Sequence, residues 1–212
     1  METRRLESFS DGVFAVAITV LVFNLLTIGD RGLTYGTLLS SRTWPQYFAY
    51  VVGFLTIGIM WLNHHAMVMH AERVDRVTLI LNIVLLMTVV AVPFPTALVA
   101  GHLTEPGPGA AVAVVTYGVV SVLLSTAFAA MWWYLSTHQE SLASRSGAER
   151  LRSVLRFGAG LFGYIAGTLV AAFWSPIAGL VIFGLVAVYY LFEQLPSPAA
   201  GSAAGLDGVI RG

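Results

Sequence analysis

The sequence predicts an all-α, polytopic membrane protein with six transmembrane helices in each subunit. Of its 212 residues, 57% are hydrophobic and only 10% are charged, whereas a soluble domain carries roughly 25% charged residues. The mean hydropathy is +0.80. Because the apolar residues form long continuous runs rather than short segments of alternating polarity, the sequence argues against a transmembrane β-barrel.

Six apolar runs are long enough to cross a bilayer. A helix rises about 1.5 Å per residue, so about 20 residues cross a hydrocarbon layer ~30 Å thick. The runs are residues 9–28, 45–69, 77–100, 110–135, 154–174 and 177–195. We expect a tight turn at Pro176 to separate the last two runs.

Arginines in the short loops predict the orientation of the chain, because positive charge marks the cytoplasmic side of a membrane protein. Only Arg31 and Arg42 lie on one side. The other side collects Arg4, Arg5, Arg73, Arg76, Arg145, Arg150, Arg152 and Arg156. Both termini are therefore expected in the cytoplasm. We divide the chain into a six-helix transmembrane unit, residues 1–195, and a flexible cytoplasmic tail rich in small residues, 196–212.

The composition also limits the chemistry of the protein. Cysteine and lysine are both absent, which excludes disulfides, thiolate metal sites, cysteine nucleophiles and lysine-based catalysis. No pair of a nucleophile and a base, and no set of metal ligands, is visible. We therefore expect no enzymatic activity, no cofactor and no nucleic-acid partner.

Polar residues within the apolar runs are the first functional candidates, because polar groups are costly in lipid. Most lie within roughly two helical turns, on the order of 10 Å, of the cytoplasmic boundary. They are Asp11, His64, His65 and Asn82. We expect Arg5 to close a network by pairing with Asp11 or by donating to a histidine. Ser10 and Trp61 would supply further hydrogen bonds.

Three interpretations of this polar layer are open. The layer holds the first three helices together, since unpaired polar groups are expensive in lipid. Alternatively, His64 or His65 senses pH, because imidazole titrates near neutrality. A metal site of His64, His65 and His70 is disfavoured, because His102 and His138 fall on opposite sides of the membrane and complete no second cluster.

The first apolar run carries a stripe in which Val16, Thr19, Val20 and Phe23 share one helical face. In a monomer, this face would pack on a neighbouring helix, with the Thr19 hydroxyl returned to the carbonyl of Ala15. Around a symmetry axis, the same face would form stacked rings, with apolar constrictions on either side of a hydroxyl ring. Such rings can gate a pore by dewetting.

Several segments of the chain resemble the transmembrane protein 175 potassium channels. Arg5 is followed after three residues by Phe9-Ser10-Asp11-Gly12 and then by Val13-Phe14-Ala15-Val16-Ala17-Ile18-Thr19, which is a specific motif of that family. The family pattern is also similar at Trp61-Leu62-Asn63-His64-His65, Asn82 and Pro93-Phe94-Pro95-Thr96. The resemblance therefore covers the first three apolar runs in order.

The resemblance implies a subunit of a prokaryotic homotetramer in the plasma membrane, conducting cations passively with a preference for potassium. The first helix of each subunit would line a central pore that lacks the carbonyl filter loop of ordinary potassium channels. By this analogy, Val16 forms the narrowest apolar ring of the pore. Thr19 forms the threonine layer, where a potassium ion would bind transiently, and Val20 and Phe23 form further apolar rings. The expected partners are potassium ions, the lipid bilayer and other copies of the chain.

The resemblance also implies a structural role for the residues around the start of the first helix. They are Arg5, Phe9, Ser10 and Asp11, which would hold that helix in place, together with Trp61, His64 and Asn82.

At the constriction, this sequence departs from the family pattern at two positions. Val16 is smaller than the usual isoleucine or leucine, and Phe23 is larger than the usual leucine. Whether Val16 or Phe23 forms the tightest point is therefore open.

The main alternative function is a proton-coupled secondary transporter using Asp11 and His64. Such proteins usually contain broken helices in two inverted halves. Pro93, Pro95 and the glycines of residues 154–174 offer only weak candidates without a symmetric counterpart. A membrane enzyme or an assembly protein that does not conduct is a further alternative.

Overall fold

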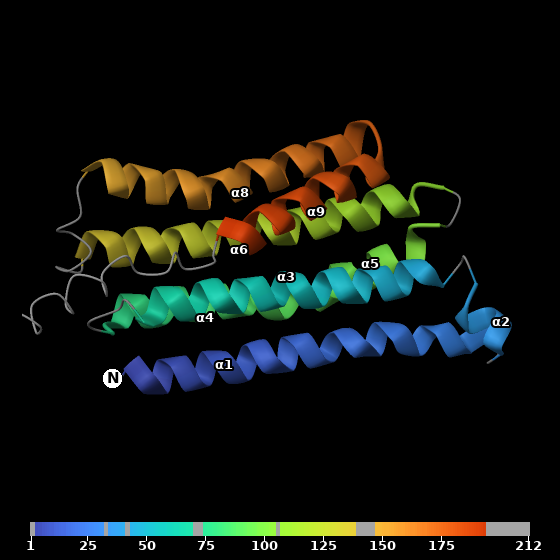
Figure 1. The fold of residues 1–212 in the computed structure, drawn as a ribbon, viewed down its shortest axis with the longest axis horizontal. Helices are drawn as coiled ribbons and strands as arrows, with labels where there is room; N and C mark the ends of the chain where they lie inside the picture. Colours follow the sequence, from blue (N-terminus) through green and yellow to red (C-terminus); the bar gives the residue numbers. More distant parts are fainter. Residues whose placement is uncertain are drawn as a thin grey trace, which may run out of the picture.

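The protein is a bundle of long helices in a computed structural model that describes residues 3–31, 34–40, 43–69, 74–104, 107–138 and 147–193. No strand occurs in these ranges, so the predicted all-α class is confirmed. The elements are α1 (Thr3–Val20), the 3₁₀ helix η1 (Leu21–Arg31), α2 (Tyr35–Leu38), α3 (Trp44–Met69), α4 (Arg76–Ala91), α5 (Pro93–His102), α6 (Gly109–His138), α8 (Gly147–Phe173) and α9 (Pro176–Glu193) (Figure 1).

Within the described residues, four helical stretches are long and apolar enough to cross a membrane. They are Thr3–Leu26, Trp44–Met69, Arg76–His102 and Gly109–His138. Two shorter apolar helices, Gly160–Phe173 and Pro176–Tyr190, occupy the last two predicted runs. The turn expected beside Pro176 is present, because α9 begins at that residue. The predicted tail, 196–212, lies outside the described residues.

Two of the predicted runs are not single α-helices. The run 77–100 is divided between α4 and α5, which meet at Val92. Pro93 explains this break, because proline has no N–H to donate and its ring clashes with the carbonyl four residues earlier. The run 9–28 changes from α to 3₁₀ geometry at Leu21. Such a long 3₁₀ segment is unusual, because its hydrogen-bond geometry is poorer than that of an α-helix.

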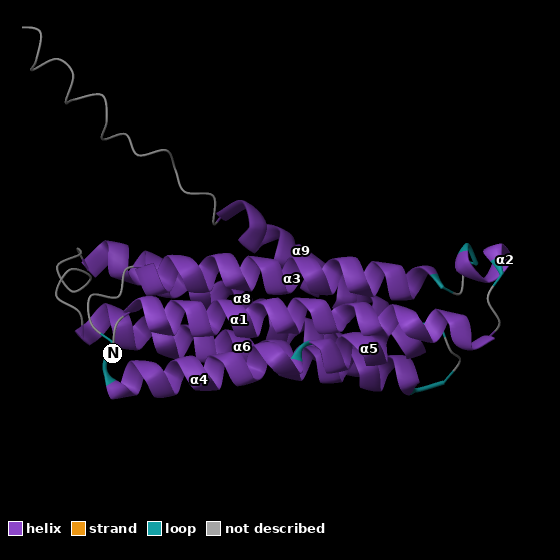
Figure 2. Ribbon diagram, turned by 90° about the horizontal axis from the view of Figure 1, so that it is seen from below, coloured by secondary structure: helices purple, strands orange, loops and turns teal. Residues whose placement is uncertain are grey.

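The helices lie side by side in layers, with α1 at one edge and α8 at the opposite edge (Figure 1). α1 packs on α3 and α4, while α6 packs on α4, α5 and α8. Seen from the α1 side, α1 lies in front of the bundle between α3 and α4 (Figure 2). One face of α1 is therefore left uncovered by the rest of the subunit.

Glycines on α8 allow close packing against α9. A Cβ atom on Gly163 would lie 2.5 Å from Val186, and one on Gly167 would lie 2.5 Å from Phe183. At Gly160 the backbone amide donates a hydrogen bond of 3.0 Å to the Tyr190 hydroxyl. Any larger side chain at these positions would separate the two helices, so the small residues set the spacing between α8 and α9.

A hydrogen-bonded aspartate ties the start of α4 to the end of α6. Asp75 caps α4 by accepting a 2.8 Å bond from the Thr78 amide, and it also accepts a hydrogen bond from the Tyr134 hydroxyl. The bonds from Tyr134 and Thr78 lower the pKa of the Asp75 carboxyl to about 2. The carboxylate therefore stays ionised at neutral pH and helps to fix one end of the bundle.

Candidate functional site

The uncovered face of α1, which continues into the start of η1, is mostly apolar. Val16 is 58% exposed, Val20 is 38% exposed and Phe23 is 60% exposed, and Thr19 between them is also exposed. The alternative in which this face packs on another helix of the same subunit does not match the structure. The stripe is therefore available to lipid or to other copies of the chain.

The opposite face of α1 explains why the stripe points outward. Its residues recur at the spacing of an α-helix and are buried against α3 and α4. They are Leu6, Ser10, Phe14 and Ala17, and Leu21 at the start of η1 continues the same buried side; Ser10 and Leu21 are fully buried. A helix buried along one side must present the other side to its surroundings, so the orientation of the stripe follows from the core.

Thr19 is the polar member of the stripe, and its hydroxyl has a defined orientation. Its Oγ1 donates a 2.8 Å hydrogen bond to the carbonyl of Val16 rather than to that of Ala15, which corrects the expected partner. A hydroxyl has one hydrogen to donate and two lone pairs that accept. Because the hydrogen is directed at the backbone, the lone pairs of the oxygen remain available on the exposed side.

The 3₁₀ geometry of η1 extends the stripe beyond the predicted residues. With three residues per turn, side chains three apart lie one above the other, so Leu26 follows Phe23 along the same line. Leu26 is 68% exposed. Leu26 was not expected, because the stripe predicted from the sequence ended at Phe23.

A buried polar network joins α1, α3 and α4 behind the stripe. The Asn82 side-chain amide donates a 3.0 Å hydrogen bond to Ser10 Oγ, and Asn82 Oδ1 lies 2.7 Å from His64 Nε2. In this arrangement Nε2 carries the hydrogen and donates it to Oδ1. The Phe14 ring packs on the His64 imidazole with ring centroids 5.3 Å apart. All three polar residues have 1% or less of their surface exposed.

A second set of contacts between α1 and α3 lies closer to the surface. Trp61 Nε1 donates a 2.8 Å hydrogen bond to Asp11 Oδ1. Glu7 Oε1 lies 3.0 Å from His65 Nδ1, a distance that suits an ion pair when the imidazole is protonated, although the alignment is not that of a hydrogen bond. The rings of Trp61 and His65 stack 5.9 Å apart. Glu7 was not anticipated from the sequence.

Two predicted members of the network stay outside it. Phe9 is 58% exposed, and Arg5 on the same helix is also exposed. Among the residues that the structure describes, Arg5 makes no ion pair with Asp11, whose carboxylate accepts from Trp61 instead. No group of three potential metal ligands gathers in the described ranges, and His70 lies outside them.

We expect Asn82→Leu to destabilise the protein strongly. The substitution keeps a side chain of similar size but leaves the buried His64 Nε2 without its acceptor, and an unsatisfied buried group costs about 1–3 kcal/mol. Ser10 loses the Asn82 donor, while its own hydroxyl still donates to the Leu6 carbonyl. Thermal unfolding in detergent, followed by size-exclusion chromatography, measures the loss. The control is Thr126→Val, because the Thr126 hydroxyl is exposed and donates only to its own helix, at Val122. Equal stability of the two variants would refute a structural role for the network.

These features define the class of the protein. Apolar helices long enough to span a bilayer, held together by a polar layer within the bundle, form a multi-pass membrane protein. The sequence pattern of the family described as the endosomal/lysosomal potassium channel TMEM175 matches residues 5–93, which contain the exposed stripe and the polar network.

Similar proteins match over nearly the whole chain. A potassium channel of Streptomyces collinus is 42% identical over 207 residues, covering 96% of this chain and 98% of its own. A potassium channel of Chamaesiphon minutus is 35% identical over 203 residues, covering 93% and 96%. The crystal structure of a lysosomal potassium-selective channel TMEM175 homolog from Chamaesiphon minutus superposes with a TM-score of 0.77 at 31% identity, covering 92% of this chain and 98% of that chain.

The chain therefore belongs to the TMEM175 family. Its members are ion channels, not enzymes, so the expected absence of enzymatic activity agrees with the family. The resemblance seen in the first three apolar runs extends through the remaining helices, since the similarity to the Streptomyces protein covers 96% of the chain.

Proposed function

We propose that this protein is a potassium-preferring cation channel, in which copies of the chain form a homotetramer and α1 of each copy lines a central pore. Conduction is passive and follows the electrochemical gradient. The main supporting observation is the uncovered stripe of Val16, Thr19 and Val20 on α1, continued by Phe23 in η1. The potassium channels named among the relatives support it.

The arrangement of polar groups on α1 favours a model in which the stripe faces the symmetry axis of an oligomer. The buried side of the helix carries Ser10, and the half-buried Asp11 is bonded to Trp61, so these groups position α1 within its own subunit. Thr19 is the polar residue left on the apolar outer stripe. In a tetramer its oxygen lone pairs would form a ring of ligands, which is a reason to prefer a pore over contact with lipid.

Selectivity in this proposal comes from partial dehydration. Potassium gives up its hydration shell more easily than sodium, so it passes an apolar ring at Val16 at a lower cost. Threonine oxygens one turn away replace part of the lost coordination. A single layer of hydroxyls gives a moderate preference, because it replaces only part of the hydration shell.

In this proposal the protein lies in the plasma membrane of a prokaryote with both termini in the cytoplasm, following the distribution of arginines. The end of the bundle where α1 begins is then cytoplasmic, and α2 is outside. Residues 1–195 form the channel unit and 196–212 form its tail. Asp11 and His64 act as structural groups, since both are bonded within the subunit.

Recording from purified protein in planar bilayers tests the function. With potassium on one side and sodium on the other, we expect single-channel currents that reverse at a potential favouring potassium. Light scattering on the same sample should give the mass of a tetramer. Flux that saturates with substrate and depends on a proton gradient would instead identify a transporter, and a symmetric oligomer that passes no current would identify an assembly protein.

A further inference from the structure

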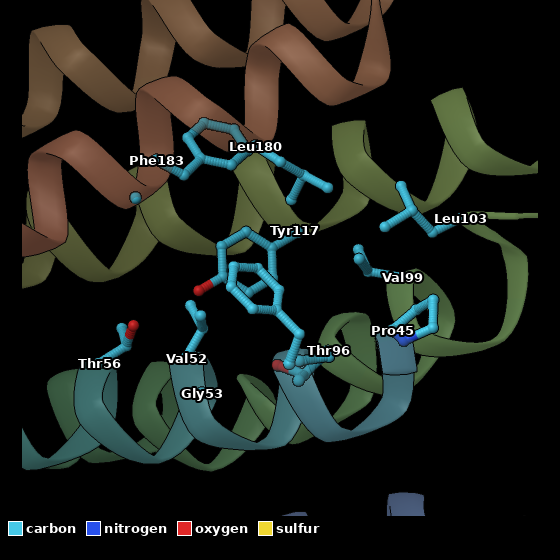
Figure 3. Close-up of a pocket in the computed structure, with 13 residues that line it drawn as sticks. Pro45, Val52, Gly53, Thr56, Thr96, Val99, Leu103, Tyr117, Leu180 and Phe183 are labelled. Atoms are coloured by element: carbon cyan, nitrogen blue, oxygen red, sulfur yellow. The ribbon is translucent and has the colours of Figure 1, made fainter. Parts of the chain in front are cut away.

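A cavity lies in the half of the bundle that contains α2, on the far side of α3 from α1. It is enclosed between α3, α5, α6 and α9, with an inner volume of about 60 Å³ and about 580 Å³ when its open mouth is included (Figure 3). Its deep wall consists of buried residues, including Gly53, Thr96, Val99, Tyr117 and Phe183. We propose that this cavity binds one acyl chain of a membrane lipid.

The chemistry of the lining points to a hydrocarbon ligand. Almost all of the lining surface is carbon, and the Thr96 hydroxyl is already used in a 2.8 Å hydrogen bond to the Val92 carbonyl. An apolar cavity of this kind does not hold water, because water needs two to four polar partners. An empty cavity would lose dispersion contacts on every wall, so an apolar ligand stabilises it.

The mouth of the cavity opens between α3 and α9 toward the lipid. Of the less buried lining residues, Phe48 and Val52 come from α3, Leu180 and Gly184 come from α9, and Leu103 follows the end of α5. Next to them, α9 presents exposed apolar side chains at Val181 and Leu185. In a membrane-spanning helix such side chains contact lipid tails, so the hydrocarbon phase is continuous with the cavity.

The extent of the lining along α3 also suits an acyl chain. The lining residues on α3 run from Pro45 to Thr56, a span of about 16 Å at 1.5 Å per residue. That length is about half of a ~30 Å hydrocarbon layer. A lipid of the leaflet on the α2 side can therefore place one tail in the cavity, parallel to the helices, without leaving its leaflet.

The site is positioned to act on the proposed pore, and this part of the inference depends on the proposed function. Gly53 lies between the cavity and the start of η1, because a Cβ atom at this position would lie 3.2 Å from Leu21 and 3.3 Å from Thr96. Leu21 is fully buried and follows Val20 of the stripe. An acyl chain in the cavity would therefore support α3 where α3 holds Leu21, at the change from α1 to η1.

Photolabelling tests the site without requiring conduction. The protein is reconstituted in phosphatidylcholine vesicles that contain a small fraction of phosphatidylcholine with a diazirine in one acyl chain. After illumination, mass spectrometry locates the adducts. We expect labelling of the buried lining residues Val99, Tyr117 and Phe183 to exceed labelling of the exposed Val181 and Leu185. Equal labelling of cavity and surface would overturn the proposal.

Two glycines provide a matched pair of variants. Neither Gly184 nor Gly58 has an atom within 4 Å of an added Cβ, but only Gly184 lines the cavity. We expect Gly184→Leu to lower the cavity labelling at least fivefold and Gly58→Leu to leave it unchanged. Val52→Phe fills the cavity from α3 and should repeat the effect if Gly184→Leu fails to fold. Cavity labelling that persists in correctly folded Gly184→Leu or Val52→Phe would refute the site.

A neighbouring subunit could fill the cavity instead of a lipid. Cross-linking through an introduced cysteine distinguishes these two occupants. Because the chain contains no cysteine, Val52→Cys introduces a unique thiol at the mouth. Efficient cross-linking of two copies through this thiol would place another subunit there and overturn the lipid site. If lipid binding supports α1, Gly184→Leu should also change potassium efflux from vesicles at least twofold relative to Gly58→Leu. If Gly184→Leu loses the cavity labelling but leaves potassium efflux unchanged, lipid binding in the cavity does not act on α1.

Discussion

Replacing Val16 by asparagine is expected to raise the potassium current at least tenfold. Val16 is an exposed apolar residue on the stripe, and in the proposed tetramer its ring excludes water. Asparagine offers both a donor and acceptors to water, so the constriction would stay hydrated. A barrier lower by only about 1.4 kcal/mol gives a tenfold higher rate, and the change is repeated in every subunit.

The control for this experiment is Val16→Leu, which enlarges the side chain and keeps it apolar. We expect this variant to conduct less than the natural protein. Single-channel recording at matched potassium concentrations compares them. Phe23→Asn, measured in parallel, decides which ring is the tighter one. A large increase from Phe23→Asn without any from Val16→Asn would place the gate in η1 instead of α1.

Replacing Thr19 by alanine is expected to lower the permeability ratio of potassium to sodium about two- to tenfold. The Thr19 hydrogen is directed at the Val16 carbonyl, which leaves its oxygen as an acceptor toward the proposed pore. Loss of a hydrogen-bonding group of this kind typically changes a free energy by about 0.5–1.5 kcal/mol, which corresponds to that range of ratios.

Reversal potentials with potassium and sodium on opposite sides measure this ratio. Thr19→Ser retains the hydroxyl and should keep most of the preference, while Thr19→Val retains the shape and should lose it. If all three variants reverse at the potential of the natural protein, the threonine layer does not contribute to selectivity. The total current is recorded as well, because a wider constriction at this position would raise it independently of selectivity.

The polar layer could be predicted only in part from the sequence. Depth along the helices predicted that Asp11, His64, His65 and Asn82 would share one layer, with further hydrogen bonds from Ser10 and Trp61, because each helix rises by a constant amount per residue. In the structure only His64 and Asn82 of these four are bonded to each other. The structure supplies the pairing, in which Asn82 bridges His64 and Ser10. Arg5 was expected to pair with Asp11, but Trp61 takes that position. Depth alone does not specify the direction in which a long side chain points.

The change of α1 to η1 at Leu21 had no local signal in the sequence. No proline or glycine occurs between Leu21 and Ile28, so the chain reads as one continuous helix. Leu21 is buried beside Gly53 of α3, and this tertiary contact accompanies the new geometry. By contrast, the break at Val92 had a visible cause in Pro93.

The sequence by itself determined that this chain is a bundle of membrane-spanning helices, because length and hydropathy follow directly from the thickness and polarity of a bilayer. It also identified the stripe on α1, since helical spacing alone places Val16, Thr19 and Val20 on one face. Only the tertiary structure decided that this face is uncovered, that Asn82 joins three helices, and that a cavity lies behind α3. Each of these depends on contacts between segments far apart in the chain, which no local pattern of residues encodes.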